Sequence, residues 1–192
     1  MAINIVEAVQ KALGFPELQK IDPNTQEVKK PENLSAEDYL PQAAIPTILL
    51  GVYKFSQTKE GNTELLSGQF NESLLQTLFK NKTPQIVEKV AEYTGNSIDY
   101  AGNKMEIIGR ETIKVIRSTL SNNPTDASVT TFLADQKHNI LVYLPASLQI
   151  GEVLSDDTID DRSHKMEGPV SNTMHWLEKL FPSTDRKKEE NF

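Results

Sequence analysis

Residues 98–120, IDYAGNKMEIIGRETIKVIRSTL, decide the fold expected for this chain. Apolar side chains recur along this stretch at the spacing of one helix face, and Ser97 stands where a helix N-cap is expected. It is the longest helical pattern in the sequence, so we expect one long central helix here. The side chains predicted to lie in the core are Ala101, Met105, Ile107, Ile108, Val115 and Leu120.

A second apolar stretch, residues 43–55 (AAIPTILLGVYKF), predicts a buried core helix. It is shorter than the roughly 20 apolar residues that span a bilayer, so no transmembrane segment is expected. Just before it, Ser35 and Asp38 form a capping-box-like pair that predicts a helix start. Pro41 and Pro46 limit how far one unbroken helix can run from there, and Pro46 is expected near the first turn of the core helix.

Shorter helices are expected around these two stretches, after a polar loop at residues 56–63. The predicted start signals are Asn71, Thr83 with Pro84, and Thr125 or Asp126, and the predicted stop signals are Gly95 and Pro145. No alternating strand pattern of any length is present. The fold class is therefore predicted to be all-α, a compact bundle of about six to eight helices.

The 192 residues divide into four predicted regions. Residues 1–15 form an N-terminal amphipathic helix that docks on the core, and residues 16–34 form an exposed polar linker with a turn at residues 22–24. Residues 35–181 form a single helical domain. Residues 182–192 are a charged tail that is expected to be disordered.

Charge and composition narrow the function classes. The formal net charge is −7. Nucleic acids and anionic membranes are themselves negatively charged and bind basic surfaces, so neither is an expected partner. Without cysteine there is no disulfide, thiolate metal site or cysteine nucleophile. Motifs such as G-x-S-x-G and G-x-x-x-x-G-K-[ST] are absent, which favours a protein that is not an enzyme. The first residues lack a signal-peptide pattern, and a cytoplasmic location is expected.

Residues 86–109, IVEKVAEYTGNSIDYAGNKMEIIG, resemble the helical repeat of uncharacterised bacterial YidB-like proteins. In that repeat a short helix ends in a Thr-Gly-small-residue turn before a longer helix, and here the turn is residues 94–97. The resemblance covers about residues 63–155, without the glycine-rich segments often seen in the family. It implies a bundle of about six helices with one central, and brings no catalytic residues with it.

The densest acidic cluster begins near residue 152. Five carboxylates fall within ten residues with no base among them: Glu152, Asp156, Asp157, Asp160 and Asp161. On one helix these side chains would stack at spacing four, and such like-charge pairs are destabilising. The repulsion is relieved if the chain leaves the helix near Ser155, if the following Arg162, His164 and Lys165 fold back, or if a cation binds.

Two metal-binding interpretations apply to the same segment. Residues 156–160 read D-D-x-x-D and locally resemble the first aspartate-rich motif of polyprenyl diphosphate synthases, in which carboxylates hold Mg²⁺ against a diphosphate. The chain has no second such motif. Residues 156–167 also match an EF-hand calcium loop in part, with oxygen ligands from Asp156, Thr158, Asp160 and Glu167. The sixth position of that loop, which needs glycine, is Asp161.

His164, Glu167 and His175, with Arg162 nearby, offer a third candidate site, for a transition metal or for acid–base chemistry. Gly168-Pro169 separates the two histidines, so the sequence does not predict that they converge.

The function expected from the sequence is a non-enzymatic helical interaction or structural module without a cofactor. It presents the acidic segment to a protein partner or to a second copy. The alternative is a site for Mg²⁺ or Ca²⁺ in residues 152–167, with Asp156, Asp157, Asp160, Asp161 and Glu167 as ligands, that acts on a phosphorylated or diphosphate substrate.

Overall fold

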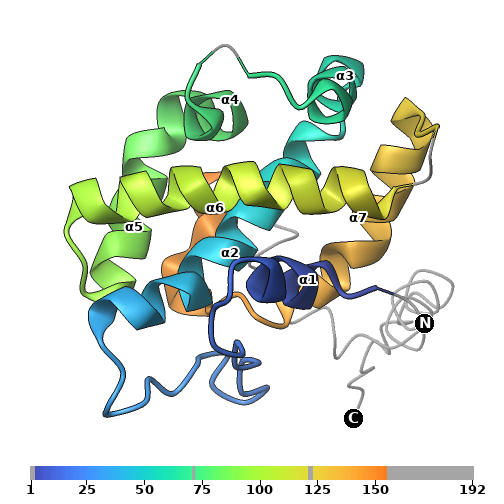
Figure 1. The fold of residues 1–192 in the computed structure, drawn as a ribbon. Coiled ribbons are helices and arrows are strands. Elements are labelled where there is room, and N and C mark those ends of the chain that lie inside the picture. The colour runs from blue at the N-terminus through green and yellow to red at the C-terminus, as the bar shows by residue number, and fades with distance from the viewer. Residues whose placement is uncertain (1–2, 71, 121–122, 155–192) are drawn as a thin grey trace, which may run out of the picture. The chain divides into compact units, whose positions relative to one another are not determined.

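The computed structural model describes residues 3–70, 72–120 and 123–154, and helices are the only regular secondary structure in these ranges. The all-α prediction is confirmed (Figure 1). The longest helix is the predicted one, and it has 22 residues. In chain order the elements are α1 (Ile5–Ala12), α2 (Ala36–Phe55), α3 (Lys59–Ser67), α4 (Leu74–Phe79), η1 (Lys80–Lys82), α5 (Thr83–Thr94), α6 (Ile98–Thr119), α7 (Asp126–Leu141), η2 (Ala146–Leu148) and α8 (Ile150–Val153).

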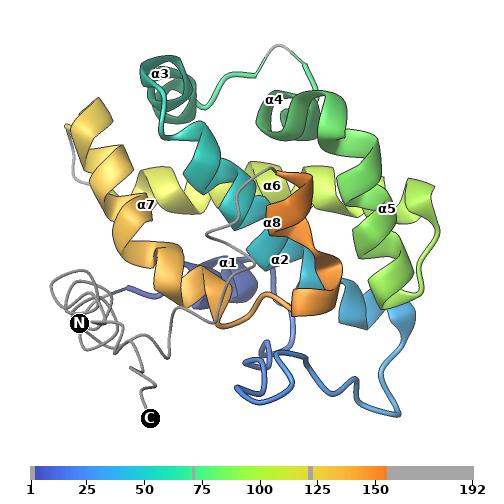
Figure 2. The same ribbon diagram turned by 180° about the vertical axis from the view of Figure 1, so that it is seen from behind.

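Helix α2 is the most deeply buried element, because every residue from Tyr39 to Val52 is buried. It packs against α1, α4, α5, α6 and α7. Helix α6 crosses in front of α2 in Figure 1, and the view from behind in Figure 2 shows α8 on the opposite side of α2. With neighbours on several sides, α2 carries apolar residues around its whole circumference, as a buried helix does.

The prolines do not interrupt α2, so the prediction that they limit the helix is wrong. One helix runs from Ala36 to Phe55 with both Pro41 and Pro46 inside it. Each proline lacks the N–H that would donate to the carbonyl four residues earlier, at a typical cost of about 3 kcal/mol in a helix interior. Burial of the surrounding apolar side chains offsets this cost, because packing stabilises a helix in a protein more than local propensity does. The predicted cap is confirmed, since Ser35 Oγ accepts the N–H of Asp38 at 3.1 Å.

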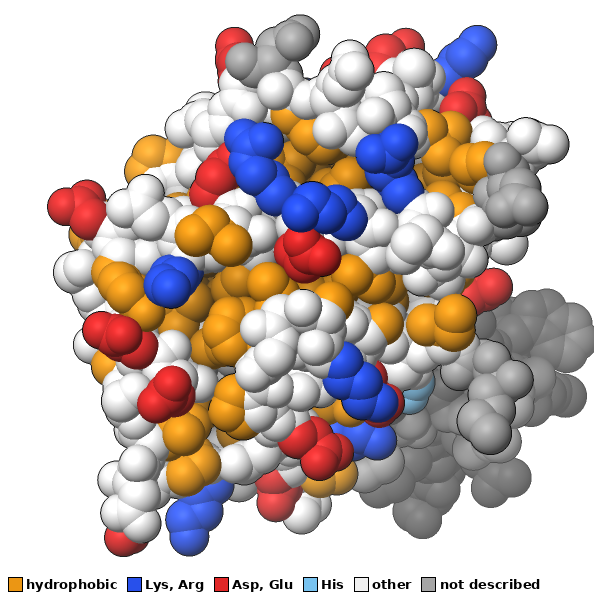
Figure 3. Space-filling view, viewed as in Figure 1, with side chains coloured by type: hydrophobic (Ala, Val, Ile, Leu, Met, Phe, Trp, Pro, Cys, Tyr) orange, Lys and Arg blue, Asp and Glu red, His pale blue; other side chains and the backbone are white. Residues whose placement is uncertain are grey.

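Helix α6 begins at its predicted cap, where Ser97 Oγ accepts the N–H of Tyr100. Ala101, Met105 and Ile108 are fully buried as predicted, whereas Ile107 is 56% exposed, so its assignment to the core is wrong. Ile107 lies about 100° around the helix from Ile108, which turns it away from α2. Figure 3 shows that hydrophobic side chains reach the surface on this face among charged ones.

The boundaries of several shorter helices also differ from the predictions. Residues 56–63 are not only a polar loop, because α3 begins at Lys59 with Thr58 Oγ1 accepting the N–H of Gly61. Helix α4 is capped by Ser73, not by Asn71. Thr83 lies inside α5 as its first residue instead of capping it. Gly95 ends α5 as predicted, at a φ of +76° that favours glycine.

The N-terminal segments pack onto the helical body. The three buried side chains of α1 are Ile5, Val6 and Val9, and the N–H of Ile5 donates to Gln136 Oε1 on α7. The predicted turn is present, since Asp22 Oδ1 accepts the N–H groups of Asn24 and Thr25. The polar segment 16–34 is less exposed than its composition predicts, because its apolar residues Leu18 and Val28 are buried.

Within the described part of the chain, no helix is long and apolar enough to cross a bilayer. The predicted end of the helical domain at residue 181 and the predicted tail 182–192 lie outside the described residues.

The packing predicts opposite effects of substitution at Gly51 on α2 and at Gly102 on α6. A Cβ at Gly51 would fall 2.6 Å from Cζ of the buried Phe79 ring, so Gly51→Ala should lower the free energy of unfolding by about 1–3 kcal/mol. At Gly102 the same Cβ meets only Val87 Cγ1 at 3.5 Å, so Gly102→Ala should raise it by about 0.5–1 kcal/mol. Urea unfolding of both variants measures the difference. Equal stabilisation by the two changes would contradict the packing at Gly51.

Candidate functional site

The predicted site residues lie outside the part of the chain that the structure describes. These residues are Asp156, Asp157, Asp160, Asp161, Arg162, His164, Glu167 and His175. Of the acidic cluster only Glu152 is described, and it is exposed on α8. The metal-binding and histidine interpretations of residues 156–175 therefore remain predictions. In residues 3–70, 72–120 and 123–154, no three His, Asp or Glu side chains are grouped so that they could hold a metal ion.

A different cavity is lined by described residues that include Leu154, the last described residue of the chain. It has a volume of about 350 Å³ and forms between the end of α2, the start of α3, the α4–η1 turn and the end of α8. Three lysines line it, Lys54, Lys80 and Lys82, and we call it the lysine pocket. Its apolar lining consists of Phe55, Leu78, Phe79, Val153 and Leu154, and Thr58 and Asn81 complete it.

Among the residues that the structure describes, the charged side chains that line the lysine pocket are all lysines. Lys54 Nζ donates a hydrogen bond to the carbonyl oxygen of Leu154 at 3.0 Å, which joins the end of α2 to the end of α8. Lys80 and Lys82 form no ion pair with any residue that the structure describes. The positive charges of Lys80 and Lys82 beside a concave apolar surface attract anions.

The backbone of Lys80 has an unfavourable conformation, with φ +52° and ψ −131°. This region favours glycine, because the Cβ of any other residue crowds the backbone. The surrounding contacts hold the conformation in place: the Lys80 N–H donates to the Gln76 carbonyl, and Thr83 Oγ1 donates to the Lys80 carbonyl at 2.8 Å. Strained residues of this kind cluster at functional sites, where the rest of the fold sets their geometry.

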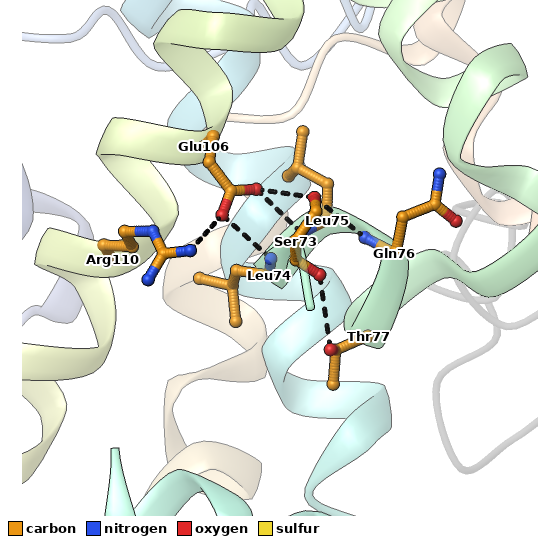
Figure 4. Close-up of polar contacts among 7 residues, drawn as sticks. All are labelled: Ser73, Leu74, Leu75, Gln76, Thr77, Glu106 and Arg110. Atoms are coloured by element: carbon orange, nitrogen blue, oxygen red, sulfur yellow. Dashed lines mark hydrogen bonds and ion pairs between the residues drawn. The ribbon is translucent and has the colours of Figure 1, made fainter. Parts of the chain in front are cut away.

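A carboxylate on α6 fixes the start of α4, the helix that carries Leu78 and Phe79 into the lysine pocket (Figure 4). Glu106 accepts the N–H of Leu74 at 2.9 Å, the N–H of Leu75 at 3.1 Å and the hydroxyl of Ser73 at 2.8 Å. The first N–H groups of any helix lack partners inside it, so Glu106 caps α4 from a neighbouring element. Arg110 Nη2 lies 2.8 Å from Glu106 Oε1 and holds this carboxylate in position.

Opposing effects act on the pKa of Glu106. Partial burial raises this pKa, but the hydrogen bonds from Leu74, Leu75 and Ser73 and the charge of Arg110 together lower it below its ordinary value of 4.5. The ionised carboxylate is therefore part of the folded structure. Its role is structural, because its oxygens are used by the start of α4.

Protein-family models, curated proteins and solved structures give no match to this chain. The resemblance of residues 86–109 to YidB-like proteins therefore remains a prediction.

The sequence does not predict the lysine pocket, because Lys54 is far from Lys80 and Lys82 in the chain and the three lysines match no motif. The weak signal that was present is Lys80-Asn81-Lys82 directly before Thr83-Pro84, where a turn enters a helix.

The cap at α4 predicts a pH-dependent loss of stability in Glu106→Gln. At pH 7 the free energy of unfolding of the variant should be about 1 kcal/mol lower than that of the wild type, which is the typical cost of losing a helix N-cap. Because the folded pKa is lowered, the carboxylate contributes fully above the unfolded pKa, near 4.5, and its contribution is lost as the pH falls through the folded value. The difference between wild type and variant should thus be constant near neutral pH and shrink below pH 4.5.

Urea unfolding at a series of pH values measures this difference. The control is Glu111→Gln on the same helix, which removes only the exposed ion pair with Lys114 and should cost less than about 0.5 kcal/mol. A difference for Glu106→Gln that does not change with pH would contradict the role of the charged carboxylate.

Proposed function

We propose that this protein is a non-enzymatic helical interaction module. Its helical body holds the acidic segment, defined as Asp156, Asp157, Asp160 and Asp161, for a protein partner or a second copy of the chain. The contact is electrostatic, so the surface that meets the acidic segment should be basic.

The observation that carries this proposal is the anchoring of α8 directly before the acidic segment. Ile150 and Val153 of α8 are 0% and 3% exposed, and α8 packs against α5. Lys54 on α2 also binds the carbonyl of Leu154, the last residue described before the segment. A segment that follows a fixed point on a packed body has a defined origin on the surface, which reduces the entropic cost of engaging a partner.

A second copy of the chain is a partner of suitable chemistry. Lys80 and Lys82 line the lysine pocket and form no ion pair with a residue that the structure describes, so they are complementary in charge to the acidic segment of another molecule. Such a contact joins two different surfaces and weakens as salt screens the charges.

Self-association of this kind predicts a salt-dependent mass in sedimentation velocity. The weight-average mass of the wild type should rise with protein concentration at about 0.05 M salt and return to that of the monomer at about 0.5 M, where screening is strong. Replacing Asp156, Asp157, Asp160 and Asp161 with Asn should leave a monomer at both salt concentrations. Glu60→Gln/Glu64→Gln, which removes exposed charge from α3, should associate like the wild type. If the four-Asn variant associates equally, the acidic segment is not the contact.

The second candidate function is a divalent-cation site in residues 152–167 that acts on a phosphorylated or diphosphate substrate. The lysine pocket favours it, because lysine is a common phosphate ligand and Leu154, two residues before Asp156, lines the pocket. In that case the cation and the lysines would together neutralise the negative charge of the phosphate groups.

Thermal unfolding in EDTA and then in Mg²⁺ or Ca²⁺ distinguishes the two functions. The interaction module predicts the same melting temperature with and without the cation. A cation site filled at 100 times its dissociation constant predicts about 2.7 kcal/mol of added stability, a rise of roughly 5–10 °C for a chain of this size. Asp156→Asn/Asp160→Asn should abolish any such rise and Glu60→Gln/Glu64→Gln should retain it. A rise that follows this pattern would replace the first function with the second.

A further inference from the structure

We propose that the turn between α4 and α5 is a strained hinge for domain swapping, and that Pro84 keeps this hinge closed in the wild type. When the hinge opens, α4 and α5 continue as one helix, and α1–α4 of one copy pack against α5–α8 of a second copy. The contact that forms is the apolar core itself, so the inference does not depend on the acidic segment or on either candidate function above.

The two halves of the chain on either side of this turn build the core together. Helix α2 packs against α5, α6 and α7, α1 packs against α6 and α7, and α3 packs against α7. Leu74 of α4 lies close to Gly109 of α6, where a Cβ would be only 2.8 Å from Leu74 Cδ2. A second copy offers the same complementary surfaces, so a swapped dimer reproduces these contacts between copies.

The turn itself is very short and strained. Helix α4 ends at Phe79, η1 occupies Lys80–Lys82, and α5 begins at Thr83. The change of direction depends on Lys80, whose φ of +52° and ψ of −131° belong to a region that glycine occupies and other residues avoid. Gln149 also has a positive φ, but its ψ of +39° places it in the allowed left-handed helical region. Short hinges under strain favour domain swapping, because extending the hinge removes the strain.

Pro84 opposes the open form. In a continuous helix its ring would clash with the carbonyl four residues earlier, which belongs to Lys80, and it has no N–H to donate to that carbonyl. In the closed turn Pro84 lies at the start of α5, where proline is tolerated, and Thr83 Oγ1 donates to the Lys80 carbonyl instead. Pro84 is exposed, so packing does not offset its cost as it does for Pro41 and Pro46 in α2.

Two opposing effects therefore meet in each hinge. Opening relieves the strain at Lys80 but places Pro84 in a helix interior. The typical cost of such a proline is at least as large as that of one strained residue, so the wild type stays closed. Replacing Pro84 leaves the strain at Lys80 unopposed, and the balance moves to the swapped dimer.

The test is sedimentation velocity of the full-length Pro84→Ala variant after unfolding in urea and refolding at high protein concentration. Salt is kept at about 0.5 M, where electrostatic contacts of the acidic segment are screened. The variant should have twice the mass of the monomer and keep it on dilution, because dissociation requires both copies to unfold. The wild type should be a monomer after the same treatment. So should Pro23→Ala, which replaces an exposed proline in the turn at residues 22–24.

The double variant Lys80→Gly/Pro84→Ala tests whether strain drives the exchange. Glycine tolerates this φ, so the closed turn of the double variant is unstrained. Each swapped dimer contains two hinges, so the dissociation constant of the dimer should rise by roughly 30-fold or more relative to Pro84→Ala. Urea unfolding verifies that both variants are folded. If Pro84→Ala does not refold, Pro84→Glu, which also lacks the ring, carries the same prediction.

Isotope-filtered NOEs distinguish a swapped dimer from two closed copies side by side. The dimer is refolded from an equal mixture of ¹³C-labelled and unlabelled Pro84→Ala. The contact between a Leu74 methyl group and the Hα atoms of Gly109 should then join the labelled copy to the unlabelled one. In a side-by-side dimer the same contact stays within one copy.

Four outcomes would overturn the proposal. Pro84→Ala could fold and remain a monomer, or the double variant could dimerise as strongly as Pro84→Ala. The contact between Leu74 and Gly109 could stay within one copy of the dimer. Finally, the wild type could already be a dimer at about 0.5 M salt, which would remove the role of Pro84. A mass of the wild type that rises only at low salt, with a monomeric Pro84→Ala at high salt, would retain the acidic contact and exclude the hinge.

Discussion

The burial of α2 is the constraint on which the rest of the structure depends. Fourteen consecutive residues of this helix, Tyr39 to Val52, are hidden from solvent, so other elements must cover it on all sides. Helices α1, α4, α5, α6 and α7 provide this cover. Close approach is built into two positions: Gly51 accommodates the Phe79 ring, and at Gly109 of α6 a Cβ would lie 2.8 Å from Leu74 Cδ2. The short α4 therefore packs between α2 and α6, and the carboxylate of Glu106 fixes its first turn.

The lysine pocket is a consequence of where this burial ends. The last turn of α2 leaves the core at Lys54 and Phe55, and the α4–η1 turn and the end of α8 meet it there. Apolar side chains from the edge of the core thus lie beside lysines that belong to the surface. Leu154, the last residue described before the acidic segment, also lines this cavity. Both candidate functions therefore depend on the chain crossing between core and solvent at this point.

The elements that the sequence predicted best are those whose signals are local. Ser97 and Gly95 delimit helices by hydrogen bonding and by φ, which neighbouring residues determine, so their positions agree with the structure. The failures involve packing between distant segments. Ile107 fits an apolar pattern but lies beyond the face that α2 covers, and Pro46 is tolerated inside α2 because burial outweighs a lost hydrogen bond. The lysine pocket could not be predicted for the same reason, since only the folded chain brings Lys54 near Lys80 and Lys82.

The hydrogen bond between Ile5 and Gln136 has a consequence for synthesis of the chain. These residues are 131 positions apart in the sequence, and the bond joins α1 to the helix that also covers α2. At about 5–20 residues per second, a ribosome needs roughly 7–26 s to make the intervening chain. Within that time the apolar α2 is completed first, and α6 and α7, which bury it, are made later. Until the helices that bury it have been made, an apolar segment exposes its side chains to chaperones and to aggregation. The order of the elements along the chain therefore makes the period of translation the one in which this fold is most vulnerable.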